Sequence, residues 1–167
     1  MSIETIQFHC PQSGTSYFPD VIDAIVSFIS REPKDKYKVI VGSDSTVLGR
    51  EPFASSIISV IIVWRIGRGA TYFWTKAKPQ MFYSLRDRIV REALESITLA
   101  QEVRSQLVER LGNRFLWDGN EIHVDMGEGG ESRECIKEVT GLIRGYDFIP
   151  VMKPEAWCAS TVADKYT

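Results

Sequence analysis

Two aspartates stand at the ends of apolar segments, where a carboxylate is costly to bury without a partner. Asp44 lies in the segment VGSDS and Asp125 in the segment IHVDMG. For either residue alone, an aspartate that caps a turn is the ordinary interpretation. Two carboxylates brought together, however, must shift a pKa, share a proton or hold a cation. The pair therefore predicts acid–base or cation-binding chemistry, provided that the fold brings the two residues together.

The segments that position these aspartates have the pattern of strands. Residues 37–47 form a β-branched and nearly uninterrupted apolar run, which is typical of a central strand buried on both faces. Short turns around the next two segments predict an antiparallel meander, and Pro150 favours a sheet edge for the last strand. Five strands are predicted, over residues 37–47, 54–65, 70–76, 121–126 and 148–152.

Helical patterns accompany these strands, after a start before Pro19 that we expect to be irregular. The longest helix begins at Ser84, ends at Gly112 and can cross a whole sheet. After a three-stranded meander, such a helix most simply returns the chain as a strand parallel to the first, by a right-handed crossover. We therefore expect one α/β domain over residues 1–167, with a five-stranded mixed sheet in the order 3-2-1-4-5 flanked by helices. The helices are predicted over residues 21–30, 84–112, 132–144 and 156–166.

Parallel neighbouring strands end at the same edge of a sheet, so Asp44 and Asp125 should meet where open α/β sheets bind ligands. The helix periodicity adds Glu92 at the margin of the apolar face, whereas Glu95 points toward the polar side. A glutamate whose stem covers the core and whose head reaches solvent is an equally good interpretation of Glu92. Asp164, in the last helical stretch, is the fourth candidate, and a solvated aspartate at a helix end is its simpler interpretation.

Four carboxylates from two strands and two helices suit a pair of hard divalent cations, because Mg²⁺ and Mn²⁺ prefer oxygen ligands. Two such ions about 4 Å apart clamp a scissile phosphate, where one activates water and the other stabilises the leaving oxygen. The predicted chemistry is therefore hydrolysis of a phosphate ester by a two-metal mechanism. Its catalytic residues and metal ligands would be Asp44, Glu92, Asp125 and Asp164.

Basic and aromatic side chains alternate between the second predicted strand and the long helix. Asp87 is the sole acid between residues 65 and 91, where aromatic residues such as Tyr72 and Trp74 are interleaved with basic ones. This mixture suits phosphate contact and base stacking in a nucleic acid. A solvated face around core aromatics is the alternative interpretation. The candidate nucleic-acid contacts are Arg65, Arg68, Lys76, Lys78, Arg86, Arg88 and Arg91.

The four acids, on the first strand, the long helix, the fourth strand and the last helix, resemble the pattern of the ribonuclease H-like superfamily. The strings IVGSDSTV, HVDMGEGG and ASTVADKYT are more narrowly similar to a small bacterial family, the YkuK-like proteins. The resemblance runs over about residues 8–167. It implies a ribonuclease H-like fold, with Asp44, Asp125 and Asp164 as ligands of Mg²⁺ or Mn²⁺ and Glu92 as the fourth, although REALES offers two glutamates. It also implies a nuclease that leaves 5′-phosphate and 3′-hydroxyl ends.

Composition narrows the remaining functions. The chain has 167 residues and a formal charge of -2, so a nucleic acid must be held by a local patch and not by a global field. Its three cysteines, an odd number far apart in the sequence, exclude a disulfide framework and favour a reducing cytoplasm. We expect no membrane attachment, because the start of the chain lacks a signal-peptide pattern and residues 56–64 are too few to cross a bilayer.

Two other functions are consistent with parts of the sequence. A non-catalytic nucleic-acid-binding or assembly module would need the basic segment but not the four acids. A nucleotide-dependent phosphotransferase is suggested by residues 125–129, DMGEG, which resemble a glycine-rich phosphate loop. Proteins of that class place a nucleotide between two lobes, and 167 residues supply one lobe. The nuclease is therefore the preferred prediction.

Overall fold

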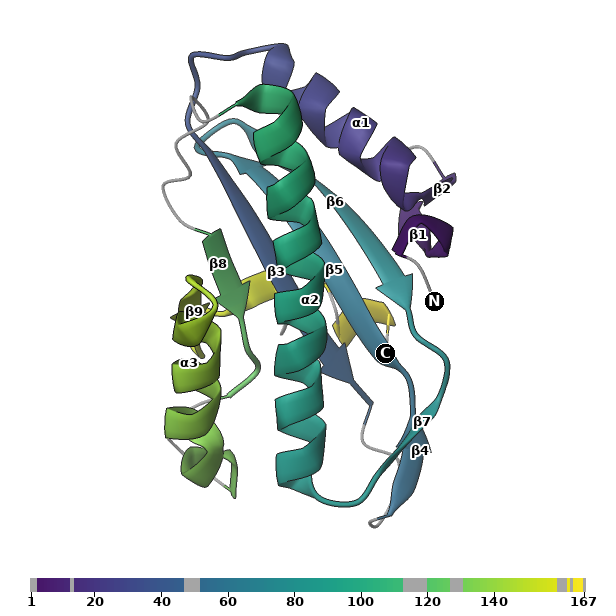
Figure 1. Cartoon of the computed structure of the whole chain (residues 1–167), viewed down its shortest axis with the longest axis vertical. Helices are drawn as coiled ribbons and strands as arrows, with labels where there is room; N and C mark the ends of the chain where they lie inside the picture. Colours follow the sequence, from purple (N-terminus) through teal and green to yellow (C-terminus); the bar gives the residue numbers. More distant parts are fainter. Residues whose placement is uncertain are drawn as a thin grey trace.

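The apolar run that begins at Tyr37 forms β3 (Tyr37–Ser45), the strand at which the main sheet changes from antiparallel to parallel pairing. In this computed structural model, the described residues are 3–12, 14–46, 52–112, 120–126, 131–158, 162 and 164–166. The other strands of the main sheet are β1 (Gln7–Cys10), β2 (Gly14–Tyr17), β5 (Ile57–Arg65), β6 (Gly69–Lys76), β8 (Asn120–His123) and β9 (Ile149–Val151). Their order is β2-β1-β6-β5-β3-β8-β9 (Figure 1).

The predicted α/β class and strand order are confirmed, because the order 3-2-1-4-5 corresponds to β6-β5-β3-β8-β9. The predicted number of strands is wrong: within the described residues the main sheet has seven strands, not five. The segment expected to be irregular forms the hairpin β1–β2 beside β6. Each of these two strands has four residues, which is too short for an alternating pattern to stand out. The register pair His9↔Trp74 joins the hairpin to β6.

The second predicted strand is divided in two. Its first residues belong to β4 (Phe53–Ser55), which pairs with β7 (Gln80–Phe82) in a separate two-stranded sheet. Its remainder is β5, which pairs with β3 over the full length from Tyr37↔Arg65 to Ser45↔Ile57. The predicted antiparallel meander is thus confirmed as β3-β5-β6, with the small sheet at one end of it.

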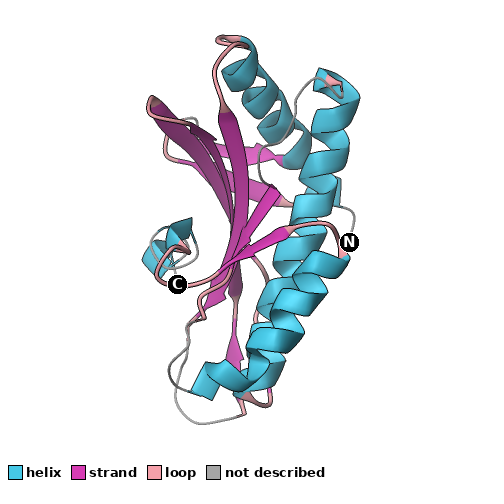
Figure 2. Cartoon of the chain, turned by 90° about the vertical axis from the view of Figure 1, so that its left-hand side faces the viewer, coloured by secondary structure: helices cyan, strands magenta, loops and turns pink. Residues whose placement is uncertain are grey.

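Among the described residues, α1 (Phe18–Ser30), α2 (Leu85–Leu111) and α3 (Ile136–Gly145) lie on one face of the main sheet. The C-terminal residues lie on the other face (Figure 2). As predicted, α2 begins at the cap Ser84, whose hydroxyl accepts a hydrogen bond from the amide of Asp87 at 3.1 Å. It ends at Gly112, whose φ of 72° favours glycine. None of the helices in the described part of the chain has both the length and the apolar composition needed to span a membrane.

The ends of two predicted helices differ from the structure. Residues predicted as the start of the helix 132–144 form the 3-10 turn η2 (Glu131–Cys135), and α3 follows it. The predicted stretch 156–166 ends in another 3-10 turn, η4 (Asp164–Tyr166), while residues 159–161 and 163 lie outside the described part.

The C-terminal residues are attached to the sheet by aromatic side chains. The rings of Tyr166 and Trp74 stack with their centroids 4.2 Å apart, and the hydroxyls of Tyr166 and Tyr72 are 3.0 Å apart. Cys158 is fully buried in the same apolar cluster, together with Ile58 of β5. The sheet thus carries apolar clusters on both of its faces.

Candidate active site

Asp44 and Asp125 lie just past the point where two parallel strands stop pairing. The register of β3 and β8 ends at Gly42↔His123, and each aspartate follows its member of that pair by two residues. Asp44 is buried, with 8% of its surface exposed. The expectation that the two residues share one edge of the sheet therefore agrees with the register.

Side-chain alternation along β3 directs Asp44 away from α2. Its neighbours Ser43 and Ser45 both face the helix, because Ser96 donates a hydrogen bond to Ser43 at 2.9 Å and Ser45 donates one to Glu92 at 2.6 Å. Successive strand residues point to opposite faces, so Asp44 points toward the face that carries the C-terminal residues. Glu92 and Asp44 thus approach the end of the strand from its two sides.

Glu92 is a buried carboxyl group with an unusual proton affinity. Its exposed fraction is 8%, and burial raises its pKa to about 8, to which the nearby charges of Asp44 and Asp125 contribute. The guanidinium of Arg88 and the hydroxyl of Ser45 act in the opposite direction. The influence of both aspartates on this pKa indicates that the three acids share one electrostatic environment.

Arg88, one helical turn before Glu92, contacts its buried carboxyl group. Its Nη1 atom lies 3.7 Å from Oε1 of Glu92 and donates a hydrogen bond of 3.3 Å to the backbone carbonyl of Ser45. The guanidinium therefore joins α2 to the end of β3. Because it contacts both a carboxylate and a strand carbonyl, it fixes Glu92 while partly compensating its charge.

Asp125 has a cationic neighbour that the sequence analysis did not consider. The ammonium of Lys153 lies 2.6 Å from its Oδ1 atom. That oxygen is shielded from solvent and makes no hydrogen bond of ordinary geometry with the described residues, so the ion pair is its principal contact. The backbone amide of Lys153 donates to the carbonyl of Met126 at 2.9 Å, which holds the lysine at this edge. The predicted order of the strands could have indicated this neighbour, because residues that follow β9 lie beside those that follow its parallel neighbour β8.

Three carboxylates fit a divalent cation in their donor chemistry, since Mg²⁺ and Mn²⁺ take oxygen ligands. Asp44, Glu92 and Asp125 supply such oxygens, and their mutual repulsion makes positive charge favourable between them. Among the side chains that the structure describes, however, no three His, Cys, Asp or Glu groups form a cluster that could hold a metal ion. A shared ion therefore requires side-chain rotation, above all of Asp125 away from Lys153.

The two glutamates of the REALES segment in α2 lie in different places. Glu92 is the one near the aspartates, as the helix periodicity predicts, whereas Glu95 is exposed and lines a groove beside the N-terminal residues. The side chain of Asp164 lies outside the described part of the chain, although its backbone belongs to η4. The loop of residues 127–130, considered above as a phosphate loop, also lies outside it.

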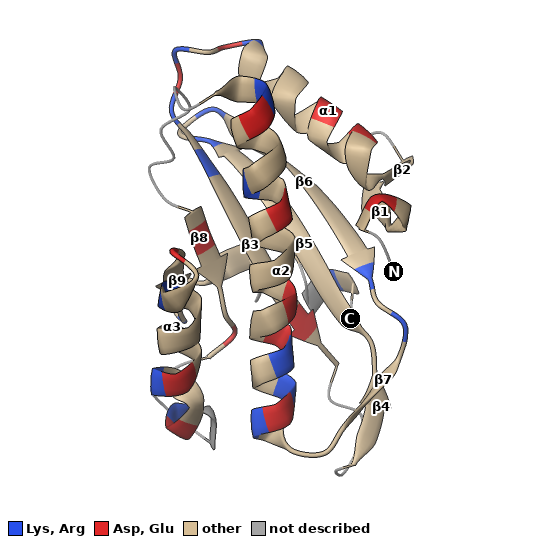
Figure 3. Cartoon of the chain, in the orientation of Figure 1, with Lys and Arg blue, Asp and Glu red and all other residues tan. Residues whose placement is uncertain are grey.

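The seven basic candidates fall into separate groups (Figure 3). Arg65 forms an ion pair with Asp35, and Tyr37 is its register partner, which puts it at the start of β3. The end of β3 at Asp44 is seven residues away, or about 23 Å. Arg68 also contacts Asp35, at 3.8 Å.

Basic residues near the acids differ in their partners. Arg86 forms a bidentate contact with Glu138, and Arg91 pairs with Asp87 at 2.7 Å. Lys76 and Lys78 are exposed and form no ion pair with any described side chain. Within the described structure, these two lysines are the basic candidates most available to an added anion.

His123 is a packed histidine. It is 1% exposed, its Nδ1 accepts a hydrogen bond from the amide of Cys158 at 3.2 Å, and its Nε2 lies 3.1 Å from Glu121. The accepting Nδ1 leaves the proton on Nε2, which donates to the Glu121 carboxylate. Burial lowers the pKa of the imidazole. His123 therefore ties the C-terminal residues to β8.

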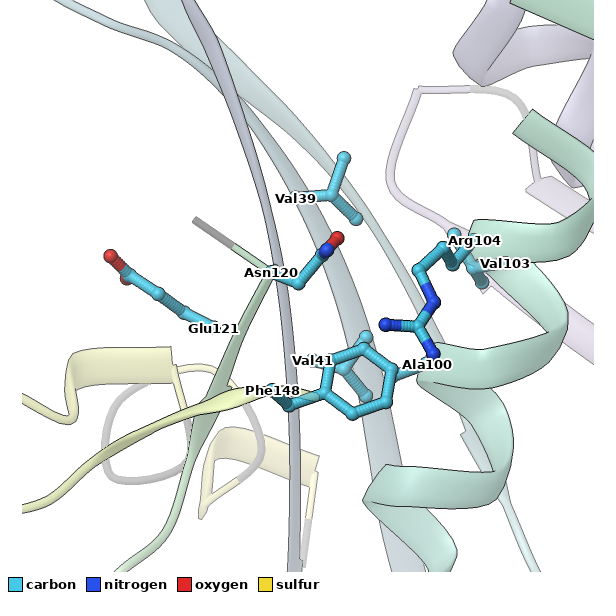
Figure 4. A pocket seen from close by; sticks show the side chains of 8 residues that line it. All are labelled: Val39, Val41, Ala100, Val103, Arg104, Asn120, Glu121 and Phe148. Atoms are coloured by element: carbon cyan, nitrogen blue, oxygen red, sulfur yellow. The ribbon is translucent and has the colours of Figure 1, made fainter. Parts of the chain in front are cut away.

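A small gap near the other end of β3 is too small to be a ligand site. Its volume is about 10 Å³, which is room for one water molecule at most. Figure 4 shows the guanidinium of Arg104 against the ring of Phe148 at its side, with the guanidinium carbon 4.3 Å from the ring centroid. The register partners Val39 and Asn120 line its wall, and Val39 lies in the first part of β3.

Comparison with known proteins agrees with this architecture. The model of the ribonuclease H-like family matches residues 20–167. The uncharacterized protein YkuK of Bacillus subtilis (strain 168) is 26% identical over 161 residues, which cover 90% of this chain and 90% of that protein. No solved structure gives a significant match. With most of its length matched, including β3, α2 and β8, the chain belongs to the ribonuclease H-like family.

Proposed function

We propose that this protein hydrolyses phosphodiester bonds of nucleic acid in a reaction that depends on Mg²⁺ or Mn²⁺. The observation that carries the proposal is the buried Glu92, whose pKa of about 8 reflects burial and the nearby charges of Asp44 and Asp125. An acid with this pKa is largely protonated at neutral pH, and a cation bound beside it would favour its ionised form. Functional sites are where such perturbed groups concentrate.

The chain's own residues would act as follows. Asp44, Glu92 and Asp125 would hold the ion through their carboxylate oxygens, and Asp164 is the proposed fourth ligand. When bound, the ion would supply an activated water and neutralise charge on the phosphate. Ser45 and Arg88 keep Glu92 in place through the contacts of 2.6 and 3.7 Å. Glu92 must lose its proton before it can coordinate, so binding should release a proton at neutral pH.

Strand register supplies a path for the substrate backbone. Asp44 pairs with Ile58, and Ile58 pairs with Lys76, so the three residues form one row across β3, β5 and β6 on one face of the sheet. Two strand spacings separate Asp44 from Lys76, or about 10 Å. This distance suits a phosphate one or two nucleotides from the scissile bond. Lys76 and Lys78 are therefore the proposed phosphate contacts.

The decisive experiment is a cleavage assay with manganese at low salt on single-stranded, duplex, hybrid and four-way-junction substrates. We expect cleavage of at least one substrate, with 5′-phosphate products, and its loss in Asp44→Asn and Asp125→Asn. Glu95→Gln is the matched control, because it removes an acid of α2 that lies outside the site. Cleavage that persists in both aspartate variants would indicate a contaminating enzyme.

A second candidate function is nucleic-acid binding without hydrolysis. The ion pair between Lys153 and Asp125 favours it, because a resident ammonium already compensates one of the acids. In that case the parent would bind the substrates of the panel in a salt-dependent manner but cleave none of them with Mg²⁺ or Mn²⁺. Binding by Asp44→Asn would then equal that of the parent.

A further inference from the structure

Tyr83 is the accessible aromatic residue of the basic segment, residues 65–91. The other four are committed to packing, two in the core and two against the C-terminal Tyr166: Phe73 and Phe82, and Tyr72 and Trp74. By contrast, 66% of Tyr83 is exposed, more than for any other large apolar side chain in the described part of the chain. Its ring takes part in none of the aromatic contacts found there. Tyr83 therefore offers a free ring face to a ligand.

Residues 53–55 and 77–83 form an arm at the end of the main sheet, built on the two-stranded sheet of β4 and β7. In Figure 1 these two strands extend past the lower end of the main sheet, and the chain passes from β7 into α2. Phe82 is buried in the arm's own apolar cluster. Its two neighbours, Met81 and Tyr83, are 40% and 66% exposed, so the side chains alternate between an inner and an outer face. The arm thus presents Met81 and Tyr83 outward.

The arm is attached at the strand end that carries the candidate active site. The amide of Ala77 donates a hydrogen bond of 2.9 Å to the carbonyl of Ile57, and Ile57 is the register partner of Ser45. Tyr83 precedes Glu92 by nine residues, or about 13 Å at the rise of a helix. This length is the span of about four stacked nucleotides of one strand. A nucleic acid at the candidate site could therefore also reach the arm.

Positive charge accompanies the exposed ring. Lys78 lies in the arm and Lys76 directly before it, and both are exposed and form no ion pair with any described side chain. Asp87, the sole acid of the basic segment, is already engaged by Arg91 at 2.7 Å and by the backbone amide of Tyr83 at 3.1 Å. The second contact holds the backbone of Tyr83 and leaves its ring exposed. A free ring beside uncompensated lysines suits a polyanion that carries flat bases.

We propose that the arm binds an unpaired stretch of the nucleic-acid substrate, with one base stacked on Tyr83 and neighbouring phosphates held by Lys76 and Lys78. This inference rests on the nucleic-acid substrate proposed above and adds a requirement for unpaired bases. Bases inside a duplex stack on one another and offer no face to the ring, whereas an unpaired base can turn onto an aromatic side chain. Met81 extends the apolar surface beside the ring.

The charge and the small area of the arm favour this occupant over a protein. In a symmetric contact between two copies of the chain, Lys76 and Lys78 of one copy would lie near the same lysines of the other. The exposed apolar surface of the arm consists of Met81 and Tyr83. Two side chains supply far less than the about 800 Å² that each partner contributes to a stable protein interface.

Fluorescence anisotropy with labelled oligonucleotides in the presence of a chelator tests the proposal without cleavage. Three probes of equal length are compared: a single strand, a blunt duplex, and an oligomer of abasic residues that keeps the phosphates but has no bases. We expect Tyr83→Ala to bind the single strand about tenfold more weakly than the parent, as for the loss of one stacked base. It should bind the duplex and the abasic oligomer as the parent does. Tyr83→Phe, which keeps the ring, should bind all three probes like the parent.

Tyr146→Ala is the matched control, because Tyr146 is 41% exposed but lies far from the arm. Its carbonyl contacts Arg104, about three turns of α2 beyond Glu92. This variant should leave all three affinities unchanged. Several results would overturn the proposal: no binding of the single strand by the parent, an unchanged affinity in Tyr83→Ala, an equal loss on the abasic oligomer, or equal weakening by Tyr146→Ala. A dimer of the parent that Tyr83→Ala dissociates would instead assign the arm to a second copy.

This inference and the proposed hydrolysis can fail separately. Binding of the single strand that depends on Tyr83, without cleavage by the parent in manganese, would contradict the hydrolysis and support the role of the arm. Cleavage by the parent, with equal single-strand affinity in the parent and Tyr83→Ala, would overturn the role of the arm alone.

Discussion

Ser45 of β3 donates a hydrogen bond of 2.6 Å to Glu92 of α2, directly beside the aspartate on the same strand. The contact joins residues 47 positions apart in the sequence, and Arg88 completes it through the carbonyl of Ser45. The helix therefore cannot slide along the strand without breaking the contacts of the buried acid. These contacts fix the position of Glu92, and several predictions depend on that position.

Glu92 should make the stability of the protein depend on pH. Its folded-state pKa of about 8 lies above the ordinary value of 4.5 for a glutamate, so the folded state binds more protons between these two pH values. Its stabilising contribution is complete below pH 4.5 and is lost as the pH rises through 8. Urea unfolding at several pH values should show that loss in the parent and a smaller one in Glu92→Gln. An equal pH dependence in both proteins would contradict the assignment, and Glu109→Gln controls for surface charge.

Divalent cations should stabilise the folded state. Ligands that bind the native protein raise its stability by mass action, and the repulsion among Asp44, Glu92 and Asp125 would fall on binding. We expect a higher melting temperature with millimolar Mn²⁺ than with a chelator, and no such shift in Asp44→Asn. Without metal, Asp44→Asn should melt no lower than the parent, because it removes a repulsive charge. A large loss of metal-free stability would show that Asp44 has a structural role.

Lys153 should compete with the proposed metal. Its ammonium lies 2.6 Å from Asp125, so a cation that uses this carboxylate must displace it. Lys153→Met keeps much of the side-chain volume but removes the charge, and we expect it to bind Mn²⁺ several-fold more tightly in calorimetric titration. Lys137→Met, on the nearby α3, is a control for the change in net charge. Weaker Mn²⁺ binding by Lys153→Met would mean that the lysine supports the site.

The basic candidates should differ in their contribution to nucleic-acid binding according to their position on the sheet. Lys76 lies in the row that contains Asp44, whereas Arg65 lies at the end of β5, opposite the start of β3, with Asp35 as its partner. Lys76→Ala/Lys78→Ala should weaken nucleic-acid binding and flatten its dependence on salt, because each phosphate contact adds to that slope. Arg65→Ala should leave both unchanged once its folded state has been verified by melting. The reverse pattern, measured by anisotropy over a salt series, would move the interface to the other end of the sheet.

The sequence was sufficient for features that rest on long or repeated patterns. The uninterrupted apolar run of β3 and the 27-residue helix α2 were predictable, and parallel pairing then followed from connection rules. Helix periodicity also placed Glu92, and not Glu95, at the margin of the apolar face, because the pattern repeats over many turns of α2. These are the elements that determine which carboxylates approach the same edge.

Features that depend on tertiary pairing could not be predicted. The hairpin β1–β2 consists of strands of four residues, which carry too little pattern to distinguish from a loop. The parallel pairing of β8 and β9 indicates that Lys153 and Asp125 lie near each other, but their contact depends on the exact end of β9, a three-residue strand. Likewise, the partners of Arg65 and Arg86 come from distant segments, so a basic run in the sequence did not show which charges were already compensated.

Both outer strands of the sheet resist the addition of a further strand. β9 is three residues long and contains Pro150, which has no amide hydrogen to donate to a new neighbour. β2 at the opposite border is equally short, begins at Gly14 and has largely polar, exposed side chains. Both borders of the main sheet therefore disfavour edge-to-edge pairing with a strand of another molecule.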